Sequence, residues 1–156
     1  MDDRQFLFLV SSTRRNGNAE LLAHHAAGRL PPRWEQRWLH HLDMPVPPFV
    51  DVRHNGGDGR YEMPTEHLRT LLDATLAATD IVFVAPVYWY SLPAAAKLYL
   101  DHWTGWLRVP GLDFRARMAG KRLWAGAVVG LGNRAGDVLN DAPGMTAAET
   151  LFIPPA

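Results

Sequence analysis

The sequence predicts an α/β fold in which helices cover both faces of a doubly wound parallel sheet. Strand-like and helix-like segments alternate along the chain, and short turns join each strand to the helix that follows it. The runs Phe6–Val10 and Ile81–Val84 are unbroken in apolar character, which is typical of parallel strands buried on both faces. We expect the strand order 2-1-3-4-5, in which the first and third strands end beside a crevice suited to ligands.

The first predicted strand, Gln5–Val10, leads into a helix over residues 18–29. The helix begins at Asn18, a residue type that favours the N-cap position, and its apolar residues recur at helical spacing. Gly28 and the pair Pro31-Pro32 end the helix.

The second strand is expected at about Arg33–His40, at the edge of the sheet. Its alternating pattern gives it one shared face, formed by Trp34, Gln36, Trp38 and His40. A long irregular stretch over residues 41–64 follows. Loops of this length in compact domains usually have a role in function or assembly.

The second helix is predicted over Thr65–Thr79, because leucines recur there on one helical face. The third strand is Asp80–Ala85. A helix at about Leu92–Trp103 and a strand at about Arg122–Val129 complete the regular alternation. Few residues then remain, so we expect a sheet that is shortened at the C-terminus, with Thr150–Ile153 as the stretch that best fits a fifth strand.

The composition limits the possible functions. The chain 1–156 is long enough for one domain with a single core. Sixteen basic and sixteen acidic residues cancel, so no positive surplus indicates a nucleic-acid partner. The absence of cysteine excludes disulfides, thiolate metal sites and a redox-active thiol, and electron chemistry would therefore need a bound cofactor. No apolar stretch is long enough to span a membrane, and we expect a cytoplasmic protein.

A polar turn follows the first strand directly. Residues 11–19 read Ser-Ser-Thr-Arg-Arg-Asn-Gly-Asn-Ala, and hydroxyls, an arginine and backbone N–H groups meet there at a predicted helix start. Such a turn binds phosphate, because the helix dipole favours an anion at this end. The turn has neither the G-x-G-x-x-G pattern nor the Gly-Lys-Ser/Thr of a P-loop, so we expect a phosphate monoester.

A second segment follows the third strand and reads Ala85-Pro-Val-Tyr-Trp-Tyr-Ser-Leu-Pro93. Three adjacent aromatic side chains at the end of a strand are costly to expose unless they border a flat ligand or a partner. In the predicted topology the two segments meet at the carboxyl edge of the sheet, although about seventy residues separate them.

Together, the two segments resemble the flavodoxin-like NAD(P)H-dependent FMN reductase family. The first matches the phosphate loop of this family at Ser12, Arg14 and Asn18. The second matches its Pro-x-Tyr-x-x-x-x-Pro-x-x-x-Lys pattern at Pro86, Tyr88, Pro93 and Lys97. The resemblance covers residues 5–135 well. It departs from the family pattern at Ser11, where the family has glycine, and at Ala19, where a hydroxyl residue is common.

The resemblance implies bound FMN, with NADPH or NADH as co-substrate. A hydride would pass through the flavin to a quinone, a flavin or another small acceptor, and no side chain would be strictly catalytic. The cofactor contacts that it implies are Ser12, Arg14, Asn16, Gly17, Asn18 and Ala19 in the first loop, Pro86, Val87, Tyr88, Trp89 and Tyr90 in the second, and Gly130, Gly132 and Asn133 after the fourth strand. We expect only one or two of the three aromatic rings to touch the flavin. The missing hydroxyl at Ala19 predicts weaker retention of FMN.

The family is usually dimeric or tetrameric, which implies a homodimer or homotetramer. The tryptophans Trp103 and Trp106 are expected to seal the third helix against a neighbouring subunit. Lys97 and Asp101 form a surface pair, and the histidine pairs at 24–25 and 40–41 are expected to be solvated rather than to bind metal. Two alternatives remain, a flavodoxin-like electron carrier and a degenerate module that has lost reductase activity.

Overall fold

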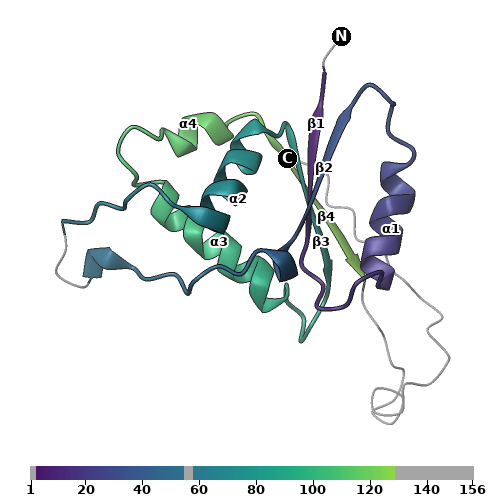
Figure 1. Cartoon of the computed structure of the whole chain (residues 1–156), viewed down its shortest axis with the longest axis horizontal. Coiled ribbons are helices and arrows are strands. Elements are labelled where there is room, and N and C mark those ends of the chain that lie inside the picture. Colours follow the sequence, from purple (N-terminus) through teal and green to yellow (C-terminus); the bar gives the residue numbers. More distant parts are fainter. Residues whose placement is uncertain (1–2, 55–57, 129–156) are drawn as a thin grey trace.

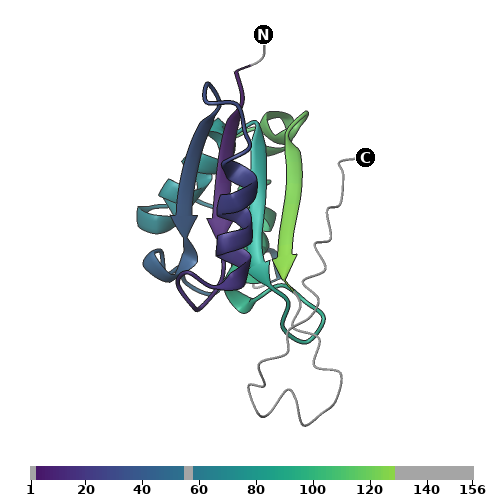
Figure 2. The same ribbon diagram turned by 90° about the vertical axis from the view of Figure 1, so that its right-hand side faces the viewer.

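The computed structural model describes residues 3–54 and 58–128 of the chain. Four parallel strands form one sheet in the order β2-β1-β3-β4. This order confirms the predicted fold class and the predicted places of the first four strands (Figures 1 and 2). The strands are β1 (Gln5–Val10), β2 (Glu35–His40), β3 (Asp80–Pro86) and β4 (Arg122–Val128). The stretch proposed as a fifth strand, 150–153, lies outside the described residues.

Helices cover both faces of the sheet, as expected of a doubly wound fold (Figure 1). Among the described residues, one helix lies on one face of the sheet and three lie on the other. They are α1 (Asn18–Ala27) on the first face, and α2 (Glu66–Ala77), α3 (Ala94–Trp106) and α4 (Phe114–Met118) on the second. The five-residue α4 was not predicted, because one helical turn is too short to show a periodic pattern. None of the helices in the described ranges has the length and apolar character that a membrane crossing needs.

The alternation of side chains along β1 divides the core into two layers. Leu7 and Leu9 face α2 and α3, where they join a cluster with Leu71 and Tyr99. The alternate residues of β1 face α1 together with the small buried side chains of that helix, which include Ala23. The second layer also contains two tryptophan rings that were predicted to share a face. Trp38 of β2 stacks on Phe8, and Trp34, which precedes β2, stacks on Phe6.

The two tryptophans of α3 belong to this chain's own core, so the prediction that they meet a neighbouring subunit is wrong. Trp106 is only 3% exposed and packs edge-on against Tyr99. Trp103 contacts Tyr99 and Phe114 in the same manner. Phe114 comes from the short α4. This unpredicted helix covers the tryptophans of α3, for which the sequence had suggested a neighbouring subunit.

The long loop over 41–64 is docked on α3. The ring of Tyr61 stacks on Phe49, and both lie against the bare backbone of Gly105. The His102 ring donates a hydrogen bond to the carbonyl oxygen of Pro47 over 2.8 Å. The loop includes two short 3₁₀ turns, at 41–43 and 52–54. The described parts of the loop are therefore packed against the rest of the fold.

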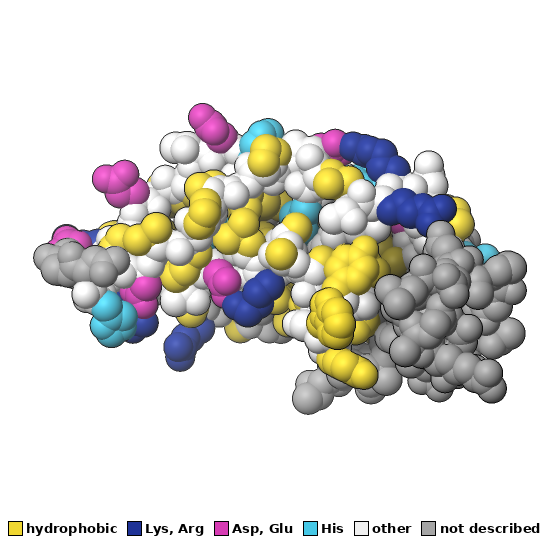
Figure 3. Space-filling view, turned by 90° about the horizontal axis from the view of Figure 1, so that it is seen from below, with side chains coloured by type: hydrophobic (Ala, Val, Ile, Leu, Met, Phe, Trp, Pro, Cys, Tyr) yellow, Lys and Arg dark blue, Asp and Glu magenta, His cyan; other side chains and the backbone are white. Residues whose placement is uncertain are grey.

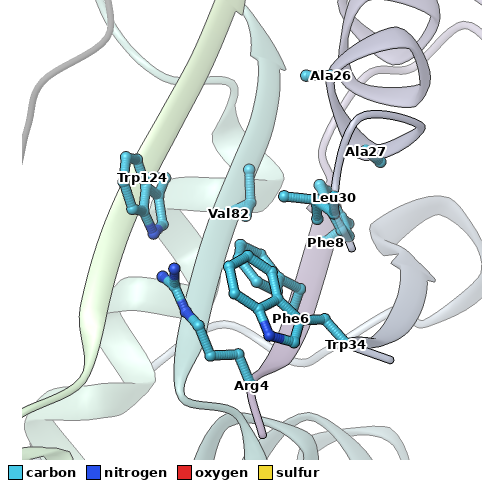
Figure 4. A pocket seen from close by; sticks show the side chains of 9 residues that line it. All are labelled: Arg4, Phe6, Phe8, Ala26, Ala27, Leu30, Trp34, Val82 and Trp124. Carbon is cyan, nitrogen blue, oxygen red and sulfur yellow. The ribbon is translucent and has the colours of Figure 1, made fainter. Parts of the chain in front are cut away.

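On the other face, α1 leaves part of the sheet uncovered near β4. A pocket of about 250 Å³ opens there between α1 and β4, and its walls are mainly apolar (Figure 4). The guanidinium of Arg4 lies at this pocket but binds the buried carboxylate of Asp80, which also accepts hydrogen bonds from Thr79 and Trp124. Arg4 also lies over the Trp34 ring, 4.6 Å from its centroid. These polar groups therefore satisfy one another and tie the amino ends of the strands together.

Candidate functional site

The two segments singled out in the sequence lie side by side at the carboxyl edge of the sheet. β1 and β3 are neighbours, with Val10 opposite Val84. The N–H of Ser11, the first residue after β1, donates to the carbonyl oxygen of Val84 over 2.8 Å. Seen from this side, hydrophobic side chains gather close to positively charged ones (Figure 3). The meeting of the two segments, predicted from topology, is thus a feature of the structure.

A tight polar turn connects β1 to α1. The Ser12 hydroxyl accepts the N–H of Arg14 over 3.1 Å and donates to the carbonyl oxygen of the same residue over 2.9 Å. Asn16 has a left-handed backbone with φ 53°, a conformation that asparagine tolerates well. The Ser12 hydroxyl therefore shapes the turn through these two hydrogen bonds.

The amino end of α1 is open. Its N-cap residue is Gly17 rather than the predicted Asn18, and no side chain caps the helix. Within the described part of the chain, no acceptor is found for the N–H groups of Asn18, Ala19 and Glu20. These donors, together with the dipole of a ten-residue helix, form a place for an anion.

One of the two arginines in the turn is available to an anion. Arg15 forms an ion pair with Asp43 across the turn. Arg14 is exposed and makes no ion pair with another described residue. Its guanidinium can therefore add charge and a planar pair of donors to the helix donors.

A buried carboxylate, which was not predicted from the sequence, supports the turn from behind. Glu20 is only 4% exposed, and its Oε2 accepts the N–H of Asn16 over 2.6 Å. Its Oε1 lies 3.2 Å from Nε2 of His40. The backbone N–H of Asn16 is thus committed to Glu20.

His40 at the end of β2 and His41 after it are not solvated, contrary to the prediction. His40 is partly buried beside Glu20, and His41 is buried on the opposite side, where its Nδ1 lies 2.9 Å from the hydroxyl of Ser11. Burial, and to a lesser degree the neighbouring His40, lowers the pKa of His41 to about 4. The ring is therefore neutral at pH 7.

The aromatic segment after β3 forms a tight turn. Tyr88 and Ser91 exchange two backbone hydrogen bonds of 3.0 Å each, and the residues between them have positive φ angles, 49° at Trp89 and 61° at Tyr90. This conformation favours asparagine and glycine, and bulky residues adopt it at a cost of about 1–2 kcal/mol each. The Trp89 and Tyr90 side chains are 94% and 98% exposed. Two large rings are thus held in water at the ligand edge of the sheet.

The described residues form two parts of a site that FMN fits, one for its phosphate and one for its ring. Open N–H donors and Arg14 suit a phosphate, and the exposed aromatic turn beside them suits a flat ring. Pro86 ends β3 and Val87 starts the turn, both partly buried, and Ala19 is buried against the core beneath α1. The remaining predicted contacts, Gly130, Gly132 and Asn133, lie outside the described residues.

Comparisons with known proteins agree with this site. The sequence model of a family described as NADPH-dependent FMN reductase matches residues 5–148. The chain is 25% identical over 172 residues to YwqN of Bacillus subtilis (strain 168), provisionally named an NAD(P)H-dependent FMN-containing oxidoreductase. That match covers 90% of this chain and 92% of YwqN.

Solved structures share the fold. The Trp repressor binding protein of Bacillus subtilis aligns with a TM-score of 0.57 at 22% identity, over 81% of this chain and 64% of that one. Smu.1420 of Streptococcus mutans UA159 aligns with a TM-score of 0.59 at 15% identity, over 86% of this chain and 72% of that one. The chain thus spans less than two thirds of the first of these structures. Because the family model matches nearly the whole sequence, the chain belongs to the NADPH-dependent FMN reductase family.

Proposed function

We propose that this chain is an FMN-dependent oxidoreductase that takes a hydride from NADPH or NADH and delivers it to a quinone, a flavin or another small acceptor. The observation that carries the proposal is the open amino end of α1, which lies at the same edge of the sheet as the aromatic turn. Bound FMN would supply the hydride chemistry. The residues of the chain bind and orient the reactants.

The first loop holds the phosphate in this proposal. The N–H groups of Asn18, Ala19 and Glu20 donate to phosphate oxygens, and Arg14 supplies the opposite charge. Ser12 keeps the turn in shape through its two hydrogen bonds to Arg14. The absence of a hydroxyl at Ala19 removes one further donor, so we expect FMN to dissociate more readily than it would from a threonine-containing loop.

The second loop borders the ring. Tyr88, which is half-exposed, and the outer Trp89 and Tyr90 provide aromatic surface for the flat ring and for the nicotinamide, and they reduce the access of water. We expect only one or two of these rings to contact the flavin. We assign no general acid or base, since transfer of a hydride needs orientation rather than a proton donor.

The proposal includes a homodimer or homotetramer in the cytoplasm. Rings as exposed as those of Trp89 and Tyr90 are typical of surfaces that a partner covers. A chain without cysteine is compatible with a reducing compartment. Light scattering of the FMN-loaded protein after gel filtration measures the mass, and a monomer would contradict this part of the proposal.

The test is an anaerobic visible spectrum of the protein loaded with FMN, recorded before and after one equivalent of NADPH and then of NADH. We expect prompt bleaching by at least one nucleotide, and recovery of the absorbance when benzoquinone is added. If FMN binds but neither nucleotide bleaches it, the electron-carrier function is correct instead. If the protein retains no FMN, the chain is a degenerate member of its family.

A further inference from the structure

The phosphate loop has a buried negative charge directly behind it. Glu20 lies in the first turn of α1, and its carboxylate is almost fully enclosed at 4% exposure. A buried carboxylate is costly unless hydrogen bonds or charges compensate it. Its position beside a loop that is to bind a second anion therefore requires an explanation.

The hydrogen bonds of Glu20 show what it does for the backbone. In a capping box, a glutamate three residues after the N-cap accepts the N–H of the N-cap residue itself. Glu20 has this spacing from the N-cap Gly17, yet its Oε2 accepts the N–H of Asn16, one residue further out, over 2.6 Å. This bond holds Asn16 in its left-handed conformation and leaves the helix N–H groups open.

The second carboxylate oxygen is turned toward two imidazoles. Oε1 of Glu20 lies 3.2 Å from Nε2 of His40 and 3.9 Å from Nε2 of His24. His24 is itself held in place by stacking on Trp38, with 4.0 Å between the ring centroids. Oε1 thus faces two imidazoles, which form ion pairs with the carboxylate when they are protonated.

These contacts give Glu20 two opposing effects on a bound phosphate. As an acceptor, it fixes the turn that presents the open donors. As an anion within the first turn, it repels a phosphate at the same helix end. The acceptor and the charge can be separated experimentally, because glutamine keeps an acceptor oxygen and loses the charge, whereas aspartate keeps the charge and is one methylene too short.

We propose that Glu20 is a positioning residue for the FMN phosphate, which organises the loop through the N–H of Asn16 while its charge limits the affinity. This inference rests on the proposed phosphate site at α1. It predicts that the length of the side chain matters more than its charge. It also predicts that the effect is confined to ligands that carry the phosphate.

The test compares Glu20→Gln and Glu20→Asp for binding of FMN and of riboflavin to the apoprotein, measured by quenching of flavin fluorescence. Glu20→Asp should weaken FMN binding about tenfold, which corresponds to the loss of one charge-assisted hydrogen bond. Glu20→Gln should bind FMN at least as tightly as the parent protein. Riboflavin affinity should stay the same in all three proteins.

Glu66→Gln is the matched control, since it removes an exposed acid from the first turn of another helix. It should change neither affinity. The proposal is overturned if Glu20→Gln weakens FMN binding as much as Glu20→Asp does, or if both variants leave the ratio of the two affinities unchanged. A parent protein that binds riboflavin as tightly as FMN would instead contradict the phosphate site itself. Thermal unfolding of each apoprotein separates a loss of fold from a loss of binding.

Discussion

Ser11 and His41 are hydrogen-bonded to one another in the interior, with 2.9 Å between the serine Oγ and the histidine Nδ1. The contact joins the residue after β1 to the residue after β2 and fixes the start of the turn between β1 and α1 from inside. Nε2 of His41 is also buried, and no described residue is its partner. Since burial, and secondarily His40, lowers the pKa of His41 to about 4, the protein keeps this ring neutral.

The first prediction concerns pH. In the unfolded chain His41 takes up a proton near pH 6.5, whereas in the folded protein it does so only near pH 4. Between these values the unfolded state holds the extra proton, so the free energy of unfolding should decrease as the pH falls. The linkage amounts to about 1.4 kcal/mol per pH unit for one proton. Urea unfolding of the apoprotein at several pH values measures it.

His41→Asn provides the comparison, because asparagine can still bond to Ser11 and does not titrate in this range. The other ionisable groups are common to both proteins, so the difference between their pH profiles isolates His41. Parallel profiles would show that His41 is not the group responsible.

The second prediction concerns Arg14, which forms no ion pair with another described residue and which we propose to bind the phosphate. Arg14→Gln should weaken FMN binding about tenfold and leave riboflavin binding unchanged, because it removes a charge that contacts only the phosphate. Arg15→Gln should have a smaller effect, since Arg15 is paired with Asp43. Equal effects of the two substitutions on FMN affinity would show that general charge, not contact, attracts the phosphate.

The third prediction concerns the docked loop. A Cβ at Gly105 would lie 2.9 Å from Cδ1 of Tyr61 and 3.3 Å from Cε2 of Phe49, so Gly105→Ala forces these rings away. We expect a loss of about 1–3 kcal/mol in the free energy of unfolding, despite the better helix propensity of alanine. At Gly28, a Cβ would come no closer than 3.5 Å to its nearest neighbour, so Gly28→Ala is the control and should be neutral or stabilising.

The fourth prediction concerns the buried pair Thr75 and Tyr99. The Thr75 hydroxyl donates to the carbonyl oxygen of Leu71 and accepts from the Tyr99 hydroxyl, whose pKa is raised by burial. Tyr99→Phe should cost about 1 kcal/mol, because threonine keeps its other bond. Thr75→Val should cost more, up to about 3 kcal/mol, because it leaves the tyrosine hydroxyl buried without an acceptor. If the two hydroxyls are coupled, the double variant should lose less free energy of unfolding than the sum of the losses in the two single variants.

The sequence was sufficient to predict the sheet, because burial on both faces makes a parallel strand apolar throughout. Phe6–Val10 is the clearest case, with alternate side chains that belong to two separate core layers. The meeting of the phosphate loop with the aromatic turn followed from strand order alone. Family membership then depended on spacings within these two loops, which are local and therefore visible in the chain.

Contacts between distant elements were not predictable in this way. His41 has the polarity of a surface residue, and only the fold places Ser11 and Tyr99 around it. The leucine and tryptophan spacing of α3 shows that a face is apolar but not which element covers it, so the role of α4 was missed. Glu20 did have a local signal, namely its position three residues after the N-cap, but the assignment of the N-cap to Asn18 obscured it.

The open end of α1 has a final consequence for the protein without its cofactor. A helix whose first N–H groups lack a cap is less stable at that end, and here the phosphate would take the place of the missing side chain. Folding of the first turn of α1 and binding of FMN would then be thermodynamically coupled. The free energy of unfolding should therefore rise with the concentration of FMN, by about 4 kcal/mol at a thousand times Kd, and the melting temperature should rise with it.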